Sequence, residues 1–282
     1  RAARYAGPPA RVSASKENPM VEPVTLPTTR FGDGSAVPLV MAHGLFGRGR
    51  NFTSAAKALV AGRPVVTLDM RNHGDAPHDT RMDYPAMAAD LAAAIEREAD
   101  GRAVLLGHSM GGKAAMTLAL TRPDLLAGLI VADIAPVPYD HPEHADIVAA
   151  MRGLDLDGVG KRSDADAPLS RAIPDPGVRA FVMQNLAIEG GRARWRPNLD
   201  ALAAGMPAIL GFPEETPEPV YEGPTLFLHG AASDYAGPST HARIRALFPE
   251  AEIEAVDGAG HWLHAEKPQA FVTAVDGWLS RL

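Results

Sequence analysis

One short segment, residues 104–115 (VLLGHSMGGKAA), constrains the fold more than any other part of the sequence. It begins as an apolar run typical of a strand and ends in small and apolar residues typical of a helix. Between the two, G-x-S-x-G places Ser109 at the apex of a sharp turn, with Gly107 and Gly111 on either side. Such a turn is strained and crowded, so residues without a Cβ atom fit best beside the serine. The segment predicts a nucleophile elbow that presents the Ser109 hydroxyl at the carboxyl edge of a sheet.

The same residues nearly match a phosphate-binding loop, which is the alternative interpretation of this segment. Gly107, Gly112 and Lys113 have the spacing that such a loop requires. Its next position carries a serine or threonine that binds magnesium, and in this chain that position is Ala114. The missing hydroxyl, together with a serine inside the loop, favours the elbow.

Apolar, strand-like runs alternate with helical patterns through most of the chain. This alternation predicts an α/β fold with a mostly parallel, twisted sheet and helices on both faces. Over residues 137–221 the period changes, because helical patterns follow one another without strands and the linkers are polar and proline-rich. We therefore expect a core of residues 21–136 and 222–282, with 137–221 inserted between strands 6 and 7 as a helical cap. Residues 1–20 are expected to be a mobile tail, with a targeting leader or an upstream extension as alternatives.

Composition excludes several classes of site and partner. The 282 residues include no cysteine, which excludes disulfides, cysteine-ligated metals and a cysteine nucleophile. The net charge of -7 argues against nucleic acid or an anionic membrane as the main partner. No apolar run approaches the roughly 18 residues of a membrane span, and we expect a cytoplasmic protein. No histidine pair has the spacing of a zinc protease site, so neither a metal nor another cofactor is expected. The oligomeric state stays open.

A second motif, residues 43–47 (HGLFG), follows an apolar strand-like run near the start of the predicted core. Its glycines allow the backbone to turn inward and to aim free N–H groups at a developing negative charge. We expect an oxyanion hole formed by the backbone N–H groups of Leu45 and Met110, the second of which directly follows the elbow serine. The alternative is a turn that only ends the strand.

A serine hydroxyl needs a base to take its proton near neutral pH, and histidine has a suitable pKa. Of the ten histidines, His261 lies in a glycine-flanked loop after the last strand-like run. His108 is adjacent to the elbow serine, so its side chain is expected to point away, and His264 lies too far into the next segment. His261 is therefore the predicted base.

Two loops offer the acid that orients this histidine. Asp133 follows the strand after the elbow, and Asp234 follows the strand after the cap. In GAASDY, the position three after the glycine, where an acid is expected, holds Ser233. Asp133 is therefore the preferred acid and Asp234 the alternative, while Asp200, inside a predicted helix, is a third candidate.

Five motifs in this order, HGLFG, DMRNHGDAP, GHSMGGK, DIAPVPY and GAGHWLHAEKP, resemble those of the α/β-hydrolase superfamily. More narrowly, they are similar to YbfF-type esterases and related abhydrolase-domain proteins, from about residue 38 to the C-terminus. Members of this group are carboxylester hydrolases, and some act on acyl-CoA thioesters. The resemblance implies Ser109 as nucleophile, His261 as base and Asp133, of the D-I-x-P motif, as acid. The aspartate retained at position 234 departs from this pattern.

The sequence thus predicts a serine carboxylester hydrolase that acts on small or acyl-chain esters, or on acyl thioesters, through an acyl-enzyme. Its expected partner is a small-molecule ester substrate. Other functions use the same fold. A carbon–carbon bond hydrolase or lyase, or a perhydrolase, would employ the same three residues. A non-catalytic ligand-binding protein would need none of them.

Overall fold

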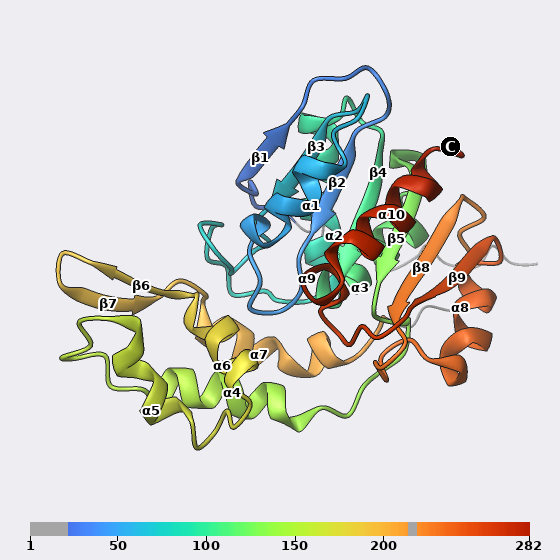
Figure 1. Ribbon diagram of the computed structural model, residues 1–282. Helices are drawn as coiled ribbons and strands as arrows, with labels where there is room; N and C mark the ends of the chain where they lie inside the picture. The colour runs from blue at the N-terminus through green and yellow to red at the C-terminus, as the bar shows by residue number, and fades with distance from the viewer. Residues whose placement is uncertain (1–21, 214–218) are drawn as a thin grey trace, which may run out of the picture.

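Within residues 22–213 and 219–282, which the computed structural model describes, seven strands form one sheet (Figure 1). In chain order they are β1 (Thr28–Phe31), β2 (Leu39–Ala42), β3 (Val65–Leu68), β4 (Ala103–His108), β5 (Leu126–Ala132), β8 (Thr225–Gly230) and β9 (Ala251–Val256). The spatial order is β1-β3-β2-β4-β5-β8-β9, with β1 antiparallel to β3 and every other neighbouring pair parallel. The predicted fold, a mostly parallel sheet with helices around it, is confirmed.

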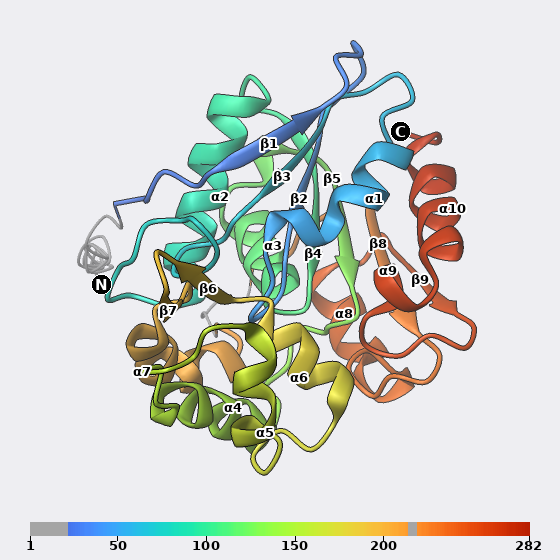
Figure 2. The same cartoon turned by 60° about the vertical axis from the view of Figure 1, so that its left-hand side comes forward.

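Helices cover both faces of the sheet because successive side chains of a strand point to opposite sides. Leu105 and Leu129 pack into the core on one face, while Val104 and Ile130 pack into the core on the other. Figure 2 shows α1 and α10 on one side of the strands and α2 on the other. The first face is covered by α2 (Tyr84–Glu98), α3 (Met110–Thr121) and α8 (His241–Leu247), and the second by α1 (Thr53–Ala58), α9 (Leu263–Glu266) and α10 (Pro268–Leu279). Short 3₁₀ turns complete the core at η1 (Gly49–Phe52), η2 (Pro123–Leu125) and η4 (Pro238–Thr240).

A long insertion follows β5 and returns to the sheet at β8. Figure 1 shows its elements gathered as a separate layer along the lower end of the sheet. The sheet strands that flank it are the fifth and sixth of the described chain, rather than the predicted sixth and seventh, because one strand fewer precedes it. The elements are α4 (Pro142–Gly153), η3 (Arg162–Ala165), α5 (Asp166–Leu169), α6 (Pro176–Met183), β6 (Leu186–Glu189), β7 (Arg192–Trp195) and α7 (Leu199–Leu210).

The insertion is not wholly helical, which corrects the expectation of helices without intervening strands. Strands β6 and β7 pair antiparallel as a hairpin. They are joined by Gly190 and Gly191, whose φ angles of 58° and 77° match the two-residue turns that suit a hairpin's twist. A Gly-Gly pair between two short alternating runs is itself a hairpin signal in the sequence. The tail predicted for residues 1–20 lies outside the described residues.

Candidate active site

Ser109 occupies the turn between β4 and α3, at the centre of the sheet. Its φ of 53° and ψ of -121° are costly for a residue with a side chain. The neighbouring glycines are required by space, since a Cβ on Gly107 would lie 2.2 Å from the carbonyl oxygen of Gly111. A Cβ on Gly111 would lie 2.5 Å from the carbonyl oxygen of Ala42 on β2. The local sequence therefore forces the strand-turn-helix that projects the Ser109 hydroxyl.

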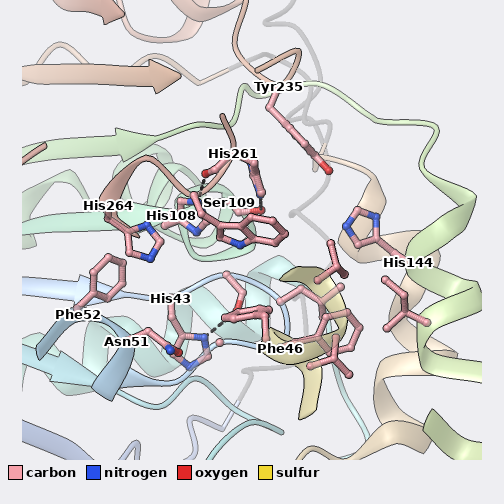
Figure 3. A pocket seen from close by; sticks show the side chains of 18 of the residues that line it. His43, Phe46, Asn51, Phe52, His108, Ser109, His144, Tyr235, His261 and His264 are labelled. Carbon is pink, nitrogen blue, oxygen red and sulfur yellow. Dashed lines mark hydrogen bonds between the residues drawn. The ribbon is translucent and has the colours of Figure 1, made fainter. Parts of the chain in front are cut away.

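His261 brings the predicted base to this hydroxyl. It lies in the loop between β9 and α9, and Figure 3 shows its ring beside Ser109. The ring atom Nε2 is 3.1 Å from the Ser109 Oγ, which donates the hydrogen bond. On the other side of the ring, Nδ1–H donates to Asp133 Oδ2 at 2.7 Å. Residues 152 and 128 positions apart in the sequence are thus joined in one hydrogen-bonded chain.

Of the three candidate acids, the structure brings only Asp133 to His261 within the described ranges. Asp133 is fully buried in the turn after β5, with φ of 52°. Its carboxylate also accepts a hydrogen bond from Gly230 N–H at 2.9 Å and one from Ser233 Oγ at 2.5 Å. Asp234 is exposed, and Asp200 of α7 pairs with an arginine on α4, Arg152, at 2.7 Å.

Leu45 and Met110 line a small cavity together with Ser109. Among the described residues, the N–H groups of Leu45 and Met110 make no hydrogen bond. Met110 is the first residue of α3, so the partial positive charge of the helix N-terminus adds to its N–H. Gly44 lets the loop approach, since a Cβ there would lie 3.0 Å from that of Ser109. The two predicted donors are therefore available to a negative oxygen.

The sequence profile of the alpha/beta hydrolase family matches residues 39–274, which includes every residue of this arrangement. The chain belongs to that family. It is 44% identical over 276 residues to the sn-1-specific diacylglycerol lipase ABHD11 of Mus musculus, covering 95% of this chain and 89% of the relative. It is 36% identical to the esterase YbfF of Escherichia coli K12, covering 86% of this chain and 93% of that one.

Solved structures agree with this placement. A marine microorganism esterase superposes with a TM-score of 0.86 at 35% sequence identity, covering 90% of this chain and 99% of its own. The family and these relatives confirm the predicted class of enzyme, a hydrolase of the carboxylesterase type.

His43 holds in place the loop of residues 43–47, which carries the Leu45 N–H and is called the donor loop below. Its Nδ1–H donates to the Gly44 carbonyl oxygen at 2.8 Å, and its Nε2 accepts from the N–H of Met70 at 2.9 Å. Burial is the largest cause that lowers the pKa of His43 to about 4, so the ring is neutral at physiological pH. A neutral ring can donate on one side and accept on the other, which ties the loop to the segment after β3.

The insertion also contacts this loop. Phe46 has a φ of 61°, and its carbonyl oxygen accepts a hydrogen bond from Asn185 Nδ2 at 2.8 Å. Asn185 lies between α6 and β6 and is fully buried. The donor loop is therefore fixed from the core by His43 and from the insertion by Asn185.

Sequence reasoning missed several side chains that support His261. His108, expected to point away from Ser109, has its Nε2–H directed at the His261 carbonyl oxygen at 2.8 Å, so it supports the loop of the base. His264 packs against His108 with ring centroids 4.8 Å apart, and burial lowers its pKa to about 4. The Tyr235 ring stacks against the His261 ring. Ser233 supports His261 indirectly, because its hydroxyl donates to Asp133. It is the one supporting residue that the sequence marks, since it occupies the position where an acid is expected.

A cavity of about 250 Å³ opens beside the Ser109 hydroxyl. The donor loop, the His261 loop and helices α4 and α6 form its wall, so core and insertion both contribute. Figure 3 shows His144 of α4 across the cavity from Ser109. Apolar surface predominates in the lining, and the apolar side chains are Leu45, Phe46, Phe52, Ile147, Val178, Phe181, Val182 and Trp262. Besides Ser109 and His261, the polar side chains are His43, Asn51, His108, Glu143, His144, Tyr235 and His264.

The described residues show neither a metal site nor a membrane-spanning helix. Between residues 22–213 and 219–282, no group of three or more histidine, cysteine, aspartate or glutamate side chains is arranged to hold a metal ion. In the same ranges, no helix combines the length and the apolar character needed to cross a membrane.

Proposed function

We propose that this hydrolase cleaves carboxylic esters through an acyl-enzyme formed on Ser109. One observation carries the proposal: the His261 ring lies between the Ser109 hydroxyl, at 3.1 Å, and the buried Asp133 carboxylate, at 2.7 Å. This arrangement suits a nucleophile, a general base and an orienting acid. Asp133 fixes the tautomer with the proton on Nδ1, which leaves Nε2 free to accept the serine proton.

In the first half of the reaction, His261 takes the proton of Ser109 as its oxygen attacks the ester carbonyl carbon. The carbonyl oxygen becomes an anion, which accepts hydrogen bonds from the N–H groups of Leu45 and Met110. Each such donor lowers the barrier by about 3 kcal/mol. The Asp133 carboxylate stabilises the imidazolium that has formed. His261 then gives its proton to the leaving alcohol, and the acyl group stays on Ser109.

In the second half, a water molecule takes the place of the alcohol. His261 accepts a proton from this water, whose oxygen attacks the acyl carbonyl carbon. The same two N–H donors stabilise the second oxyanion. His261 returns the proton to Ser109 as the carboxylic acid leaves. An acyl thioester would pass through the same steps, since only the leaving group differs.

The substrate class that the site supports is an ester with at least one apolar group. The cavity of about 250 Å³ lies just below the roughly 300–1,000 Å³ of pockets that enclose drug-sized ligands. It therefore suits a small ester, or one group of a larger one. The names of the relatives, a diacylglycerol lipase and two esterases, support hydrolysis of a carboxylic ester.

The test combines covalent labelling with turnover. Purified protein is treated with a fluorophosphonate probe and assayed with p-nitrophenyl acetate and butyrate. Ser109→Ala is expected to lose both labelling and turnover, whereas the control Ser54→Ala, at an exposed serine of α1, keeps both. Labelling without cleavage of any ester would favour a carbon–carbon bond hydrolase, a lyase or a perhydrolase. Absence of both in the wild type would favour a ligand-binding protein.

A further inference from the structure

Two cavities adjoin Ser109. Both linings include Leu45, His144 and Tyr235, and the remaining residues differ between them. The larger, of about 250 Å³, includes His261 and Trp262 in its wall. The smaller, of about 30 Å³, is lined by Met110 and Lys113 of α3 and does not include His261. The Ser109 hydroxyl thus stands between two spaces of different size.

The position of His261 indicates which cavity holds the alcohol part of an ester and which holds the acyl part. A histidine that protonates the leaving oxygen must face it, so the alcohol lies on the His261 side, in the larger cavity. The acyl group then lies in the smaller cavity, whose wall includes both expected oxyanion donors, Leu45 and Met110. Since one water molecule needs roughly 10–15 Å³, about 30 Å³ admits an acyl group of only a few atoms.

The C-terminal turn of α7 forms part of the wall of the smaller cavity, through Ile209 and Leu210. Lys113 holds this turn. Its Nζ donates to the carbonyl oxygens of Leu210 at 2.9 Å and Gly211 at 2.6 Å, and it lies 4.6 Å from the centre of the Tyr139 ring. The last carbonyls of a helix lack intrahelical donors and carry partial negative charge, so an ammonium group both satisfies and stabilises them.

Lys113 makes these contacts without a carboxylate partner in the part of the chain that the structure describes. The side chain is buried, and burial lowers the pKa of its ammonium to about 7. Two carbonyl oxygens and the faces of two aromatic rings, Tyr139 and Tyr84, therefore offset its loss of hydration. These contacts engage the ammonium with the protein, so its role is to hold α7 rather than to bind the substrate.

A second residue of the core holds the same turn. The Tyr84 hydroxyl, on α2, donates to the carbonyl oxygen of Ile209 at 2.5 Å. The N–H of Tyr139 donates to the carbonyl oxygen of Leu210 at 3.0 Å. The end of α7 is thus fixed by α2, by α3 and by the segment after β5. Its position over Ser109 is set by the core and not by the insertion alone.

We propose that Lys113 determines acyl-chain specificity by holding the C-terminal turn of α7 over Ser109, so that only short acyl groups enter the smaller cavity. This inference rests on the ester hydrolysis proposed above. Lys113 is a positioning residue, since it contacts α7 and touches no reacting atom. Release of the turn would let it move away from α3 and make room for a longer chain.

The test is a chain-length series of p-nitrophenyl esters, from acetate through butyrate and hexanoate to octanoate, with kcat and KM measured separately. In the wild type, kcat/KM is expected to fall by at least about tenfold from acetate to octanoate, since each methylene that does not fit an apolar pocket is costly. Lys113→Met keeps the length of the side chain but removes its donors. It should lower the ratio of kcat/KM for acetate to kcat/KM for octanoate at least about fivefold, through a lower KM for the longer esters. Lys113→Arg, which retains donors and charge, should restore the preference.

Tyr84→Phe is a second, milder variant that removes only the hydroxyl group that donates to the Ile209 carbonyl oxygen. It should shift the profile in the same direction and decides the question if Lys113→Met does not fold, as judged by circular dichroism. Lys57→Met, at an exposed lysine of α1, is the matched control. A wild-type optimum at long chains, or variants with the wild-type profile, would overturn the inference. Failure of the wild type to cleave any ester would instead overturn the proposed function.

Discussion

The Tyr235 ring lies against the face of the His261 imidazole, with 4.1 Å between the ring centroids and 25° between the planes. Tyr235 is itself held, because its backbone carbonyl oxygen accepts a hydrogen bond from the Tyr139 hydroxyl. That hydroxyl also accepts one from the N–H of Ala135 at 2.9 Å. The tyrosine ring is therefore placed to fix the plane in which the imidazole lies.

The first prediction concerns this stacking. Tyr235→Ala is expected to lower kcat by about 3- to 10-fold, since an aromatic pair is worth roughly 0.5–1.5 kcal/mol beyond the area it buries. Tyr235→Phe keeps the ring and should keep kcat near the wild-type value. Both are measured with saturating p-nitrophenyl acetate, because Tyr235 also lines the cavity and can change KM. Equal losses in the two variants would show that the hydroxyl, rather than the ring, is needed.

The second prediction separates the two candidate acids. Asp133→Asn is expected to lower kcat by about 10⁴-fold, the loss seen when an orienting aspartate becomes an amide. The neutral amide cannot stabilise the imidazolium as a carboxylate does, and its NH2 group can donate to Nδ1 and so favour the wrong tautomer of His261. Asp234→Asn changes an exposed side chain and serves as the matched control, with kcat near that of the wild type. A large loss from Asp234→Asn instead would assign the acid to the loop after β8.

The elbow could be predicted because part of its cause is local. The steric need for glycine at position 107 acts within five residues, because a Cβ there would meet Gly111, whereas the need at position 111 comes from the neighbouring strand β2. The choice between Asp133 and Asp234 is a different matter, since it depends on how two loops aim their side chains. Asp133 reaches the histidine because its backbone turns with φ of 52° directly after β5, and composition does not encode that turn.

Contacts between distant segments could not be predicted from the sequence. Lys113 reaches carbonyl groups 97 and 98 residues away, and Asn185 binds a carbonyl 139 residues away. No periodicity marks such pairs, because they depend on how the insertion packs on the core. The β6–β7 hairpin is the exception, since its Gly-Gly turn is a local signal that the sequence carries.

The third prediction concerns the ion pair between Arg71 and Asp90, which fastens the loop after β3 to α2. The pair is fully buried and bidentate, with N–O distances of 2.6 and 2.8 Å. Asp90→Asn is expected to lower the free energy of unfolding by about 3–5 kcal/mol, because it removes the buried carboxylate from the guanidinium and leaves only the partly exposed Asp79, at 3.6 Å. Urea unfolding measures the change, and the control is Asp124→Asn, at an exposed surface pair with Arg122. A loss no larger than that of the control would contradict the prediction.

The last prediction is a fall in stability on mild acidification. Burial is the main cause that lowers the pKa of His43 to about 4 and that of His73 to about 3, from the usual 6.5. As the pH falls below about 6.5, His43 and His73 bind protons in the unfolded chain but stay neutral in the folded protein. Stability therefore rises with pH across this window and is lost as the pH falls towards the folded pKa values.

His73→Asn tests this dependence at one residue. The asparagine amide can replace the Nδ1–H group that donates to the Arg71 carbonyl oxygen at 2.9 Å, but it does not titrate. Urea unfolding between about pH 4.5 and 7.5 should show the slope of the unfolding free energy reduced by up to about 1.4 kcal/mol per pH unit below pH 6.5. Above that pH His73 is neutral in both the folded and the unfolded wild type. The stability curves of the wild type and of His73→Asn should therefore run parallel there and diverge only at lower pH. If the wild type showed no slope in this window, the neutral histidines would not be what limits its acid stability.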